Sequence, residues 1–472
     1  MQLTEKGGTS AHCRQACRDA TAHRANFLSI AGTKVLRLTV TVVISMQVRK
    51  ALGSWRHRPS ELGDGTEGGL MRCLWITLAD PEPKTNGQLI YSGGLIQAMA
   101  SGGAELLVIG LDRHGEKDDP PSDRHKIRWQ LHRRHHNPSW RRLVSPLPTI
   151  ALYSASPAGR RAVDRALAEQ SWDAVVLDSI SSGWALSRVL RQRHRFGTLV
   201  YLAHNRETIA ARRIADAARG LRRLIRRFDT AKVAILERRL LGVADFVAAD
   251  SPDDCEALAA STAAGKVTFV PPGYDGPRVL HRNINEGVPR RAIIVGSFNW
   301  LAKRESLELF LNAAAARLAA AKVELQIVGS AEPDYLAGLR RQYPSVTFVG
   351  PVADVVPYMA SARIAVVPDL LGGFKLKGLD YVFNRLPIAS MRAGLPGMPL
   401  KDRWSFRLFD THIALAEGLI AQIDSLDILN TFHQRAFEAC AKAFDWPHVG
   451  KQLMSEMSSA SLQPADMAAL VR

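Results

Sequence analysis

The sequence has few cysteines, and they are scattered along the chain. Only five of its 472 residues are cysteine: Cys13, Cys17, Cys73, Cys255 and Cys440. An odd and dispersed set argues against a disulfide framework and fits a reducing compartment. The spacing of Cys13 and Cys17 matches no common zinc pattern. We therefore expect a cytoplasmic protein without a structural metal.

The sequence also lacks a long apolar run. The best candidate, residues 35–46, is interrupted by Arg37 and falls short of the roughly 18 apolar residues that a membrane span needs. It lies too deep in the chain for an ordinary secretory signal, and no small-residue cleavage site follows it. No membrane-spanning segment is predicted.

Acidic residues are outnumbered by basic ones. The chain has 45 Asp and Glu against 62 Lys and Arg, which gives a formal net charge of +17. Such an excess favours anionic partners, namely nucleic acid, an acidic membrane surface or phosphorylated substrates. No recognisable nucleic-acid-binding module accompanies the charge, so we expect no nucleic acid partner.

Two series of short apolar runs follow an unusual beginning. Residues 1–70 are rich in Gly, Ser, Thr and Arg. They are predicted to be a poorly ordered extension, with Met71 as the natural start. From there, short apolar runs alternate with helical stretches, which is the pattern of βαβ units. The runs are 71–78, 104–111, 174–177, 198–203, 246–249 and 267–270, then 292–295, 324–328, 346–349, 364–367 and 387–389.

Two such series predict an α/β protein made of two doubly wound, Rossmann-like domains. We place the first domain at residues 71–275 and the second at 276–445, with residues 271–276 (PPGYDG) as the hinge. Residues 446–472 are expected to form a helical tail that crosses back to the first domain.

Glycine turns follow the strands of the second series, at Gly296, Gly329, Gly350 and Gly372-Gly373. Because ligands bind at the carboxyl ends of the strands in open α/β sheets, these turns point toward one crevice. Each turn taken alone is equally consistent with ordinary strand-to-helix punctuation.

The last turn opens residues 373–380 (GFKLKGLD). Glycine lets the backbone approach a diphosphate, and the start of a helix offers free N–H groups. Lys375 and Lys377 would neutralise phosphates, and the Asp380 carboxylate would accept hydrogen bonds from hydroxyl groups. The alternative is a strand, a tight turn and an amphipathic helix without a ligand.

Several segments, in order along the chain, resemble the GT-B glycosyltransferases of the GT4-like (glycosyltransferase group 1) family. In the second half they are VGSFNW (295–300), IVG (327–329), FVGPVAD (348–354), GFKLKGLD (373–380) and RLPIA (385–389). In the first half they are YLAHNRE (201–207), a helix–strand pair at 237–251 and VPPGYD (270–275). The resemblance runs from about residue 71 to about residue 446. It implies a GT-B fold with two Rossmann-like domains facing across a cleft, and a nucleotide-sugar donor held by the second domain.

The resemblance also implies roles for single residues. His204 would lie at the reacting sugar, Lys375 at the diphosphate and Asp380 at the ribose. Lys303 is preferred to Arg304 as a second cation for the diphosphate. The implied donor-binding set is Asn86, Gly87, Gly296, Ser297, Lys303, Gly329, Val352, Gly373, Phe374, Lys377 and Leu379.

Plainer interpretations stay open for three of these positions. His204 could be a histidine satisfied at a strand end, and Asn86-Gly87 an ordinary turn. Glu207, close to His204, could simply complement a helix dipole. No DxD signature lies in a suitable loop, so we expect a metal-independent reaction without a cofactor beyond the nucleotide sugar itself.

A basic, amphipathic segment lies at residues 211–228. Its apolar residues fall on one helical stripe and its arginines, including Arg222, Arg223, Arg226 and Arg227, on the rest. Residues 124–142 form a second basic patch that holds Trp129. Both patches suit an anionic membrane surface and a lipid-linked acceptor. A solvated basic face over an ordinary core stripe is the alternative.

The sequence therefore predicts a retaining hexosyltransferase that moves a sugar from a nucleotide sugar to a membrane-associated, lipid-linked saccharide acceptor. Surface or exopolysaccharide biosynthesis, at the inner face of the membrane, is the expected setting. Two alternatives stay open. One is a nucleotide-sugar epimerase of the same architecture, which would need a cluster of carboxylates and histidines that the sequence does not reveal. The other is a non-catalytic scaffold of this fold.

Overall fold

The structure is a computed structural model. It describes residues 70–84, 86–113, 127–135, 138, 140–216, 218–263, 265–370 and 374–461. The predictions made for residues 1–69, Gly372 and Gly373 lie outside the described residues.

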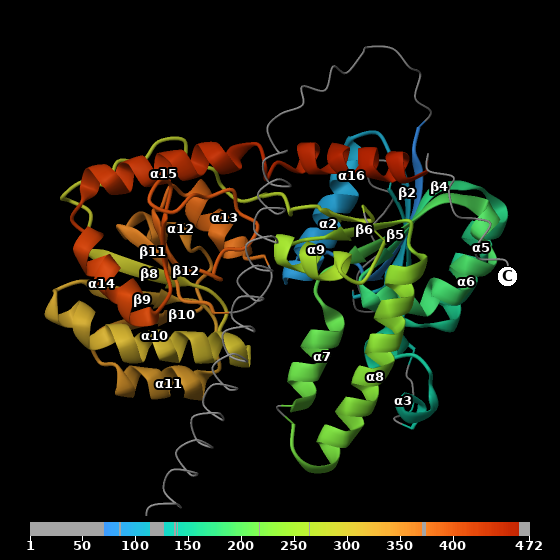
Figure 1. Cartoon of the computed structure of the whole chain (residues 1–472), viewed down its shortest axis with the longest axis horizontal. Coiled ribbons are helices and arrows are strands. Elements are labelled where there is room, and N and C mark those ends of the chain that lie inside the picture. Colours follow the sequence, from blue (N-terminus) through green and yellow to red (C-terminus); the bar gives the residue numbers. More distant parts are fainter. Residues whose placement is uncertain are drawn as a thin grey trace, which may run out of the picture. The chain divides into compact units, whose positions relative to one another are not determined.

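Seven parallel strands form the first sheet (Figure 1). Its order is β3-β2-β1-β4-β5-β6-β7, so the chain changes winding direction between β1 and β4, as in a doubly wound fold. The strands are β1 (Arg72–Ala79), β2 (Glu105–Leu111), β3 (Ile127–His132), β4 (Trp172–Asp178), β5 (Phe196–Ala203), β6 (Phe246–Ala249) and β7 (Val267–Phe269).

Both faces of this sheet are buried. Along β1, Leu74 and Ile76 enter one core while Cys73 and Trp75 enter the other, because successive side chains of a strand point to opposite faces. The first core is closed by α4 (Thr149–Ser154), α5 (Pro157–Glu169), η1 (Ile180–Ala185), α6 (Leu186–Arg191), α8 (Gly220–Val243) and α9 (Pro252–Ala259). The short elements α3 (Arg141–Val144) and η2 (Arg193–Arg195) and the helix α7 (Glu207–Asp216) complete this half.

The second core of the first sheet is covered by one helix from the beginning of the described chain and one from its end. It is covered by α2 (Gly87–Ser101) and by α16 (Trp446–Ser461), which follows the second sheet in the sequence. A Cβ atom at Gly94 would lie 2.0 Å from the Trp446 ring, so only glycine lets the two helices approach this closely.

Six parallel strands form the second sheet, in the order β10-β9-β8-β11-β12-β13. They are β8 (Arg291–Val295), β9 (Glu324–Val328), β10 (Val346–Gly350), β11 (Ile364–Val367), β12 (Ile388–Met391) and β13 (Arg407–Phe409). One face packs against α10 (Leu301–Ala320), α11 (Pro333–Gln342) and α14 (His412–Gln422). The other packs against α12 (Val356–Ala360), α13 (Leu376–Phe383) and α15 (Leu426–Ala441). The predicted α/β class with two doubly wound sheets is confirmed.

Two edge strands and the helix over residues 211–228 differ from the sequence prediction. The strands β3 and β13 were not expected, since both lie at a sheet edge and β13 has only three residues. Helix α2 begins at Gly87, because Asn86 caps it by accepting a hydrogen bond from Leu89 N at 3.1 Å. The expected helix over residues 211–228 is two helices, α7 and α8. Gly220 sits at the break with a φ of +57°, a backbone conformation that glycine adopts readily.

Candidate functional site

The carboxyl ends of β4, β5 and β6 bring a histidine and several carboxylates together. Asp178 ends β4 and His204 directly follows β5. His204 Nε2 lies 2.6 Å from Asp178 Oδ1, and Trp75 Nε1 donates to the other oxygen, Oδ2, at 2.9 Å. Tyr91 packs edge-on against the imidazole, with the ring centroids 5.4 Å apart. The ring of His204 is therefore fixed from two sides.

The pair His204–Asp178 is buried, with 6% of the histidine and 0% of the aspartate exposed. Burial alone would lower the pKa of His204, but the hydrogen bond and the charge of Asp178 outweigh it and raise that pKa. Burial would raise the pKa of Asp178, yet His204 and Trp75 bring it below its usual value. The arrangement therefore favours an imidazolium paired with a carboxylate. Among the described residues, His204 Nδ1 has no hydrogen-bond partner, so it is available to a ligand.

Two further carboxylates lie near this pair. Burial raises the pKa of Glu207, at the start of α7, and that of Asp250, just after β6, each to about 7. Asp250 Oδ1 is buried without a hydrogen-bond partner. A cluster of carboxylates and a histidine thus exists at this sheet edge. The sequence did not reveal it, because Asp178, His204 and Asp250 come from the ends of three different strands.

Other parts of the family-like segments in the first half are structural. Glu237 of α8 accepts hydrogen bonds from the backbone N–H groups of Glu207 and Thr208, at 2.7 and 3.2 Å, so it caps the start of α7. Ser251 caps α9 through Asp254 N at 3.2 Å. These contacts hold the loops that follow β5 and β6 in place.

In the second sheet, the glycine turns are joined by backbone hydrogen bonds. Gly296 N donates to Val328 O at 3.0 Å, and Gly329 N donates to Gly350 O at 2.8 Å. Gly329 has a φ of +141°, and a Cβ atom there would lie 1.7 Å from Gly296 O. The strand ends of β8, β9 and β10 can meet only because this position is glycine. Ser297 is exposed beside them, and Val352 follows β10 half-buried.

Three lysines meet at the carboxyl end of β11. Lys377 Nζ lies 2.5 Å from Asp369 Oδ2, and both side chains are largely buried. Burial lowers the pKa of Lys375 to about 8, with Asp369 opposing and Lys377 and Lys303 adding to the shift. Burial also lowers the pKa of Lys303, again with a contribution from Lys377. This mutual influence shows that the three ammonium groups share one electrostatic environment.

Asp369 is a further site residue that the sequence did not predict. Burial would raise its pKa, but the charges of Lys377 and Lys375 keep it lowered. The ion pair with Asp369 engages Lys377. Arg304, the alternative to Lys303, donates to Phe298 O at 2.8 Å and lies over the Tyr335 ring, so it is committed to the fold. The signal was present in the sequence as an aspartate directly after a buried strand.

The remaining predicted donor-binding residues of the second half differ in how far they are buried. Lys375 is the N-cap of α13, so its side chain projects from the free end of a helix. Asp380 lies half-buried in α13 beside the Tyr274 hydroxyl, and burial raises its pKa. The side chain of Leu379 is fully buried in the core, so only its backbone could meet a ligand. Phe374 packs against Phe444, with the ring centroids 5.5 Å apart.

The starts of α2 and α13 lie close together. A Cβ atom at Gly87, the first residue of α2, would lie 3.8 Å from Leu376 Cδ1, the first residue of α13. Lys84, two residues before Asn86, forms an ion pair with Asp275 at 3.0 Å. Asp250 also acts on the pKa of Lys375. Asn86 and Gly87 therefore approach the lysines of the second sheet, and both helix N-termini offer partial positive charge there.

The basic segment of the first half forms an exposed helix pair. α7 and α8 pack side by side and extend away from the strands (Figure 1). Arg222, Arg223, Arg226 and Arg227 are exposed near the start of α8, where Arg223 and Arg227 pair with Asp216 at 3.4 and 3.2 Å. The apolar stripe between them is exposed too. It consists of Ile214, Leu221, Leu224, Ile225 and Phe228.

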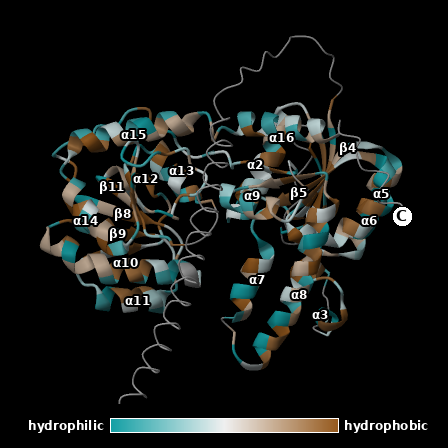
Figure 2. Ribbon diagram, viewed as in Figure 1, coloured by the Kyte–Doolittle hydropathy of each residue, from teal (hydrophilic) through white to brown (hydrophobic). Residues whose placement is uncertain are grey.

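The exposed stripe continues onto α3. Lys232 Nζ of α8 donates to the backbone of Arg142 at 2.7 Å, which ties α3 to this helix pair. Trp140, Leu143 and Val144 are exposed on it. Figure 2 shows hydrophobic and hydrophilic residues side by side along this part of α8. The alternative of an ordinary core stripe is therefore wrong. The prediction that Trp129 belongs to this surface is wrong. Trp129 lies in β3, half-buried against the core of the first sheet.

No helix in the described ranges is both long and apolar enough to cross a membrane. Within the same ranges, no group of three or more His, Cys, Asp or Glu residues is arranged to hold a metal ion.

Residues 289–424 match the family model of the glycosyl transferases group 1. A search of curated proteins found no match. Among solved structures, sucrose-phosphate synthase from Thermosynechococcus elongatus superposes with a TM-score of 0.60 at 20% identity, covering 82% of this chain and 98% of that one.

Two other solved structures are similar over the same extent. The Anabaena protein HepE in complex with UDP-glucose gives a TM-score of 0.55 at 15% identity, covering 82% of this chain and 100% of that one. The lipopolysaccharide outer core galactosyltransferase WaaB gives 0.56 at 15% identity, covering 82% and 99%. These likenesses confirm the predicted GT-B fold. With its two doubly wound sheets, the chain is a GT-B protein, and residues 289–424 of its second half match the glycosyl transferases group 1 model.

Proposed function

We propose that the protein transfers a hexose from a nucleotide sugar, with retention of anomeric configuration, to a saccharide acceptor at a membrane surface. The observation that carries the proposal is the Asp369–Lys377 ion pair after β11, beside the start of α13, with Lys375 and Lys303 near enough to act on the pKa of Asp369. Breaking the anomeric C–O bond leaves negative charge on a diphosphate. Fixed cations and helix N-termini stabilise that charge in the transition state.

In this proposal each sheet supplies one half of the reaction. Lys375 and Lys303 neutralise the leaving diphosphate, with the backbone at Gly296 approaching it. Asp380 accepts hydrogen bonds from the ribose, and Val352 and Leu379 contribute backbone groups around the nucleotide. His204 Nδ1 binds a sugar hydroxyl, while Asp178 acts as the positioning residue that holds the imidazole. No metal ion takes part, so chelation with EDTA should leave turnover unchanged.

A panel of nucleotide sugars tests the proposal directly. UDP-sugars come first because HepE was solved with UDP-glucose, followed by GDP-, ADP- and dTDP-sugars. Release of the nucleoside diphosphate in the presence of lipid-linked saccharides, with the α-anomeric product formed from an α-linked donor, is the expected result. Nucleotide binding without turnover on any acceptor would instead favour the scaffold.

We infer further that the protein binds the inner face of the membrane through the surface formed by α3, α7 and the first half of α8. Exposed arginines attract anionic lipid headgroups, and the exposed apolar side chains between them can enter the interface. A lipid-linked acceptor of surface or exopolysaccharide assembly would be reached there.

Vesicle flotation tests the membrane surface. The wild type should float with vesicles containing anionic lipid and not with zwitterionic ones. Replacing Arg222, Arg223, Arg226 and Arg227 with Gln should abolish flotation. Changing Arg238 and Arg239 to Gln serves as the control, since both are exposed farther along the same helix. Equal losses in the two variants would contradict a localised surface.

The epimerase is the second candidate, and the cluster around His204 is the observation that favours it. Proton abstraction from a sugar ring needs a base with a pKa near 7, and Glu207 and Asp250 both meet that condition. Incubation of the nucleotide sugars in D₂O without acceptor separates the two reactions. Deuterium in the sugar ring would establish epimerisation, whereas a transferase leaves the donor unlabelled.

A further inference from the structure

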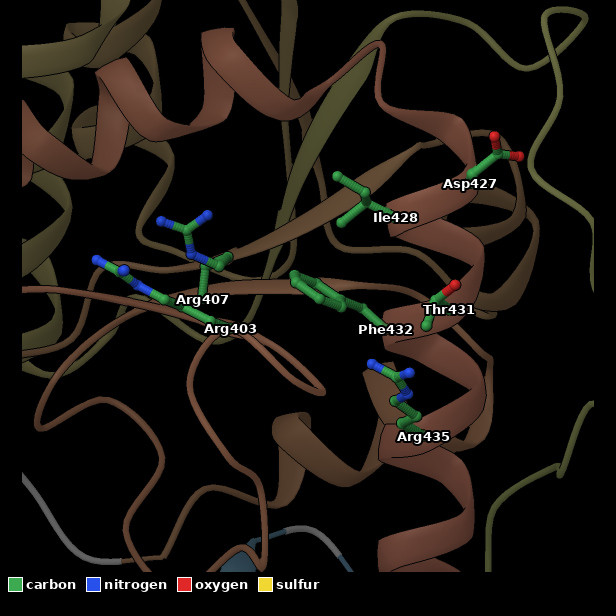
Figure 3. Close-up of a pocket in the computed structure, with 7 residues that line it drawn as sticks. All are labelled: Arg403, Arg407, Asp427, Ile428, Thr431, Phe432 and Arg435. Carbon is green, nitrogen blue, oxygen red and sulfur yellow. The ribbon is translucent and has the colours of Figure 1, made fainter.

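A hollow of about 590 Å³ lies between β13 and α15, and three arginines line it (Figure 3). Arg403 and Arg407 come from the strand side, and Arg435 comes from the helix. The other lining residues are Asp427, Ile428, Thr431 and Phe432, all on α15. None of the residues assigned to the nucleotide-sugar site lines this hollow.

The two arginines on the strand side are only partly balanced by acid. Arg407 Nε is buried without a hydrogen bond and lies 3.8 Å from Asp402 Oδ1. Arg403 Nε lies 4.0 Å from the other oxygen of the same carboxylate. Asp402 Oδ1 already accepts a hydrogen bond from Leu408 N at 2.9 Å. One carboxylate, beyond hydrogen-bond distance of both guanidinium groups, therefore faces two positive charges.

The third arginine is held in place by stacking. The guanidinium of Arg435 lies 3.4 Å from the ring centroid of Trp404, and its one hydrogen bond to a described residue is a long one, 3.4 Å to Trp404 O. Stacking on an aromatic face orients the plane of a guanidinium without using its N–H donors. Trp404 itself is about half exposed, so this stack lies at the surface.

The hollow thus combines spare donors with an apolar wall. Each guanidinium carries five N–H donors, and among the described residues the three groups share a single hydrogen bond. Ile428, Thr431, Phe432 and Arg435 follow the i, i+3, i+4, i+7 spacing and so lie on one face of α15. That face offers apolar surface, one hydroxyl and, at its N-terminal end, the Asp427 carboxylate.

We propose that this hollow is a binding site for a sugar phosphate. The phosphate, with its several acceptor oxygens, binds between Arg403, Arg407 and Arg435, for which guanidinium geometry is well matched. The sugar ring lies against Phe432 and Ile428, and its hydroxyl groups reach Thr431 and Asp427. The volume is in the range of small-molecule sites. This inference does not depend on the proposed function of the lysine site.

Calorimetric titration of the full chain with glucose 6-phosphate, inorganic phosphate and glucose tests the site. Glucose 6-phosphate should bind saturably, inorganic phosphate at least tenfold more weakly, and glucose not at all. Arg403→Ala and Arg435→Ala should each lower the affinity for glucose 6-phosphate at least tenfold. Since the Arg403 side chain is 81% exposed, its removal should leave the melting temperature unchanged.

Two control variants locate the binding. Arg392→Ala removes an exposed arginine of the same half that is paired with Asp410, and it should have no effect. Lys375→Ala should also have no effect, which separates this site from the lysine site. Absence of saturable binding would overturn the proposal, as would a loss of binding in Lys375→Ala or equal losses in Arg392→Ala and Arg403→Ala. Inorganic phosphate binding as tightly as the sugar phosphate would overturn the assignment of a sugar.

Discussion

The two sheets share one architecture but carry opposite chemistry at their carboxyl ends. At the end of the first sheet, Asp178, Glu207 and Asp250 lie around the imidazole of His204. The end of the second holds three lysines around one carboxylate, beside glycines that bring strand ends into contact. Winding and strand order are the same in kind, so the difference comes entirely from the residues that follow each strand.

This contrast separates two tasks. Carboxylates and an imidazole suit the hydroxyl groups of sugars, whereas ammonium groups and helix N-termini suit phosphates. If the division holds, changes at the first edge should lower turnover with the donor still bound. Changes at the second edge should lower donor affinity.

The largest effect is expected at Asp178. Asp178→Asn keeps the shape of the side chain but removes the charge that raises the pKa of His204 and orients its ring. We expect turnover to fall by roughly 10²-fold or more, in the range of acid–base and positioning effects, with nucleotide affinity unchanged. NMR titration should show a lower pKa for His204. Asp173→Asn, on the exposed part of β4, is the control. An unchanged pKa for His204 would remove Asp178 from this role.

A smaller effect is expected at Lys375. Lys375→Ala deletes the cation at the start of α13, and a charge-assisted hydrogen bond contributes about 1.5–3 kcal/mol. Donor affinity, measured by calorimetry, should therefore fall by roughly 10- to 100-fold. The exposed Lys401→Ala should bind the donor like the wild type. Unaltered affinity in Lys375→Ala would refute the lysine site.

The pH dependence of donor binding gives a third test. Because burial lowers the pKa of Lys375 to about 8, its ammonium is charged below that pH and neutral above it. Donor affinity should be constant from pH 6 to 7.5 and then fall, by up to about tenfold per pH unit, above pH 8. Lys375→Arg stays charged and should lose this decline. A decline of the same size in both proteins would assign it to another group.

The smallest effect concerns stability at the first edge. The pKa of Asp250 is raised in the folded state, so the folded protein holds a proton that the unfolded chain releases at lower pH. Stability from this group is lost as the pH rises from about 4 to 7. Asp250→Asn, which is never charged, should raise the melting temperature at pH 8 by about 2–4 °C, the shift that roughly 1 kcal/mol produces.

The gain in melting temperature of Asp250→Asn should shrink as the pH falls toward 4, where the wild-type Asp250 becomes neutral like the asparagine that replaces it. Asp253→Asn changes an exposed neighbour and should show no such trend. A melting temperature lower than that of the wild type at pH 8 would mean that the Asp250 charge is stabilising.

The sequence predicted the architecture because it depends on local pattern. Short apolar runs set most of the strands, and the glycine turns marked the ends of β8, β9 and β10. The edge strands β3 and β13 were missed because their residues are mixed in character and few are buried. The break between α7 and α8 was missed because Gly220 was one glycine within a convincing amphipathic stripe.

The candidate site was predictable only where one segment carries it. Lys375, Lys377 and Asp380 lie in a single stretch, so the motif was visible. The pairing of Asp369 with Lys377 and of Asp178 with His204 depends on how strand ends meet in space. Spacing alone cannot provide that information, since Asp178 and His204 are 26 residues apart.

The crossing of α16 to the first sheet makes the order of synthesis matter. Trp446, Val449, Leu453 and Met457 complete a core whose first strand begins at Arg72. A nascent chain that has emerged only as far as the first sheet has α2 on that face, but the apolar area that α16 covers stays exposed until this last described helix is made. The first half produced alone should therefore aggregate, and adding residues 446–461 as a separate peptide should restore its solubility.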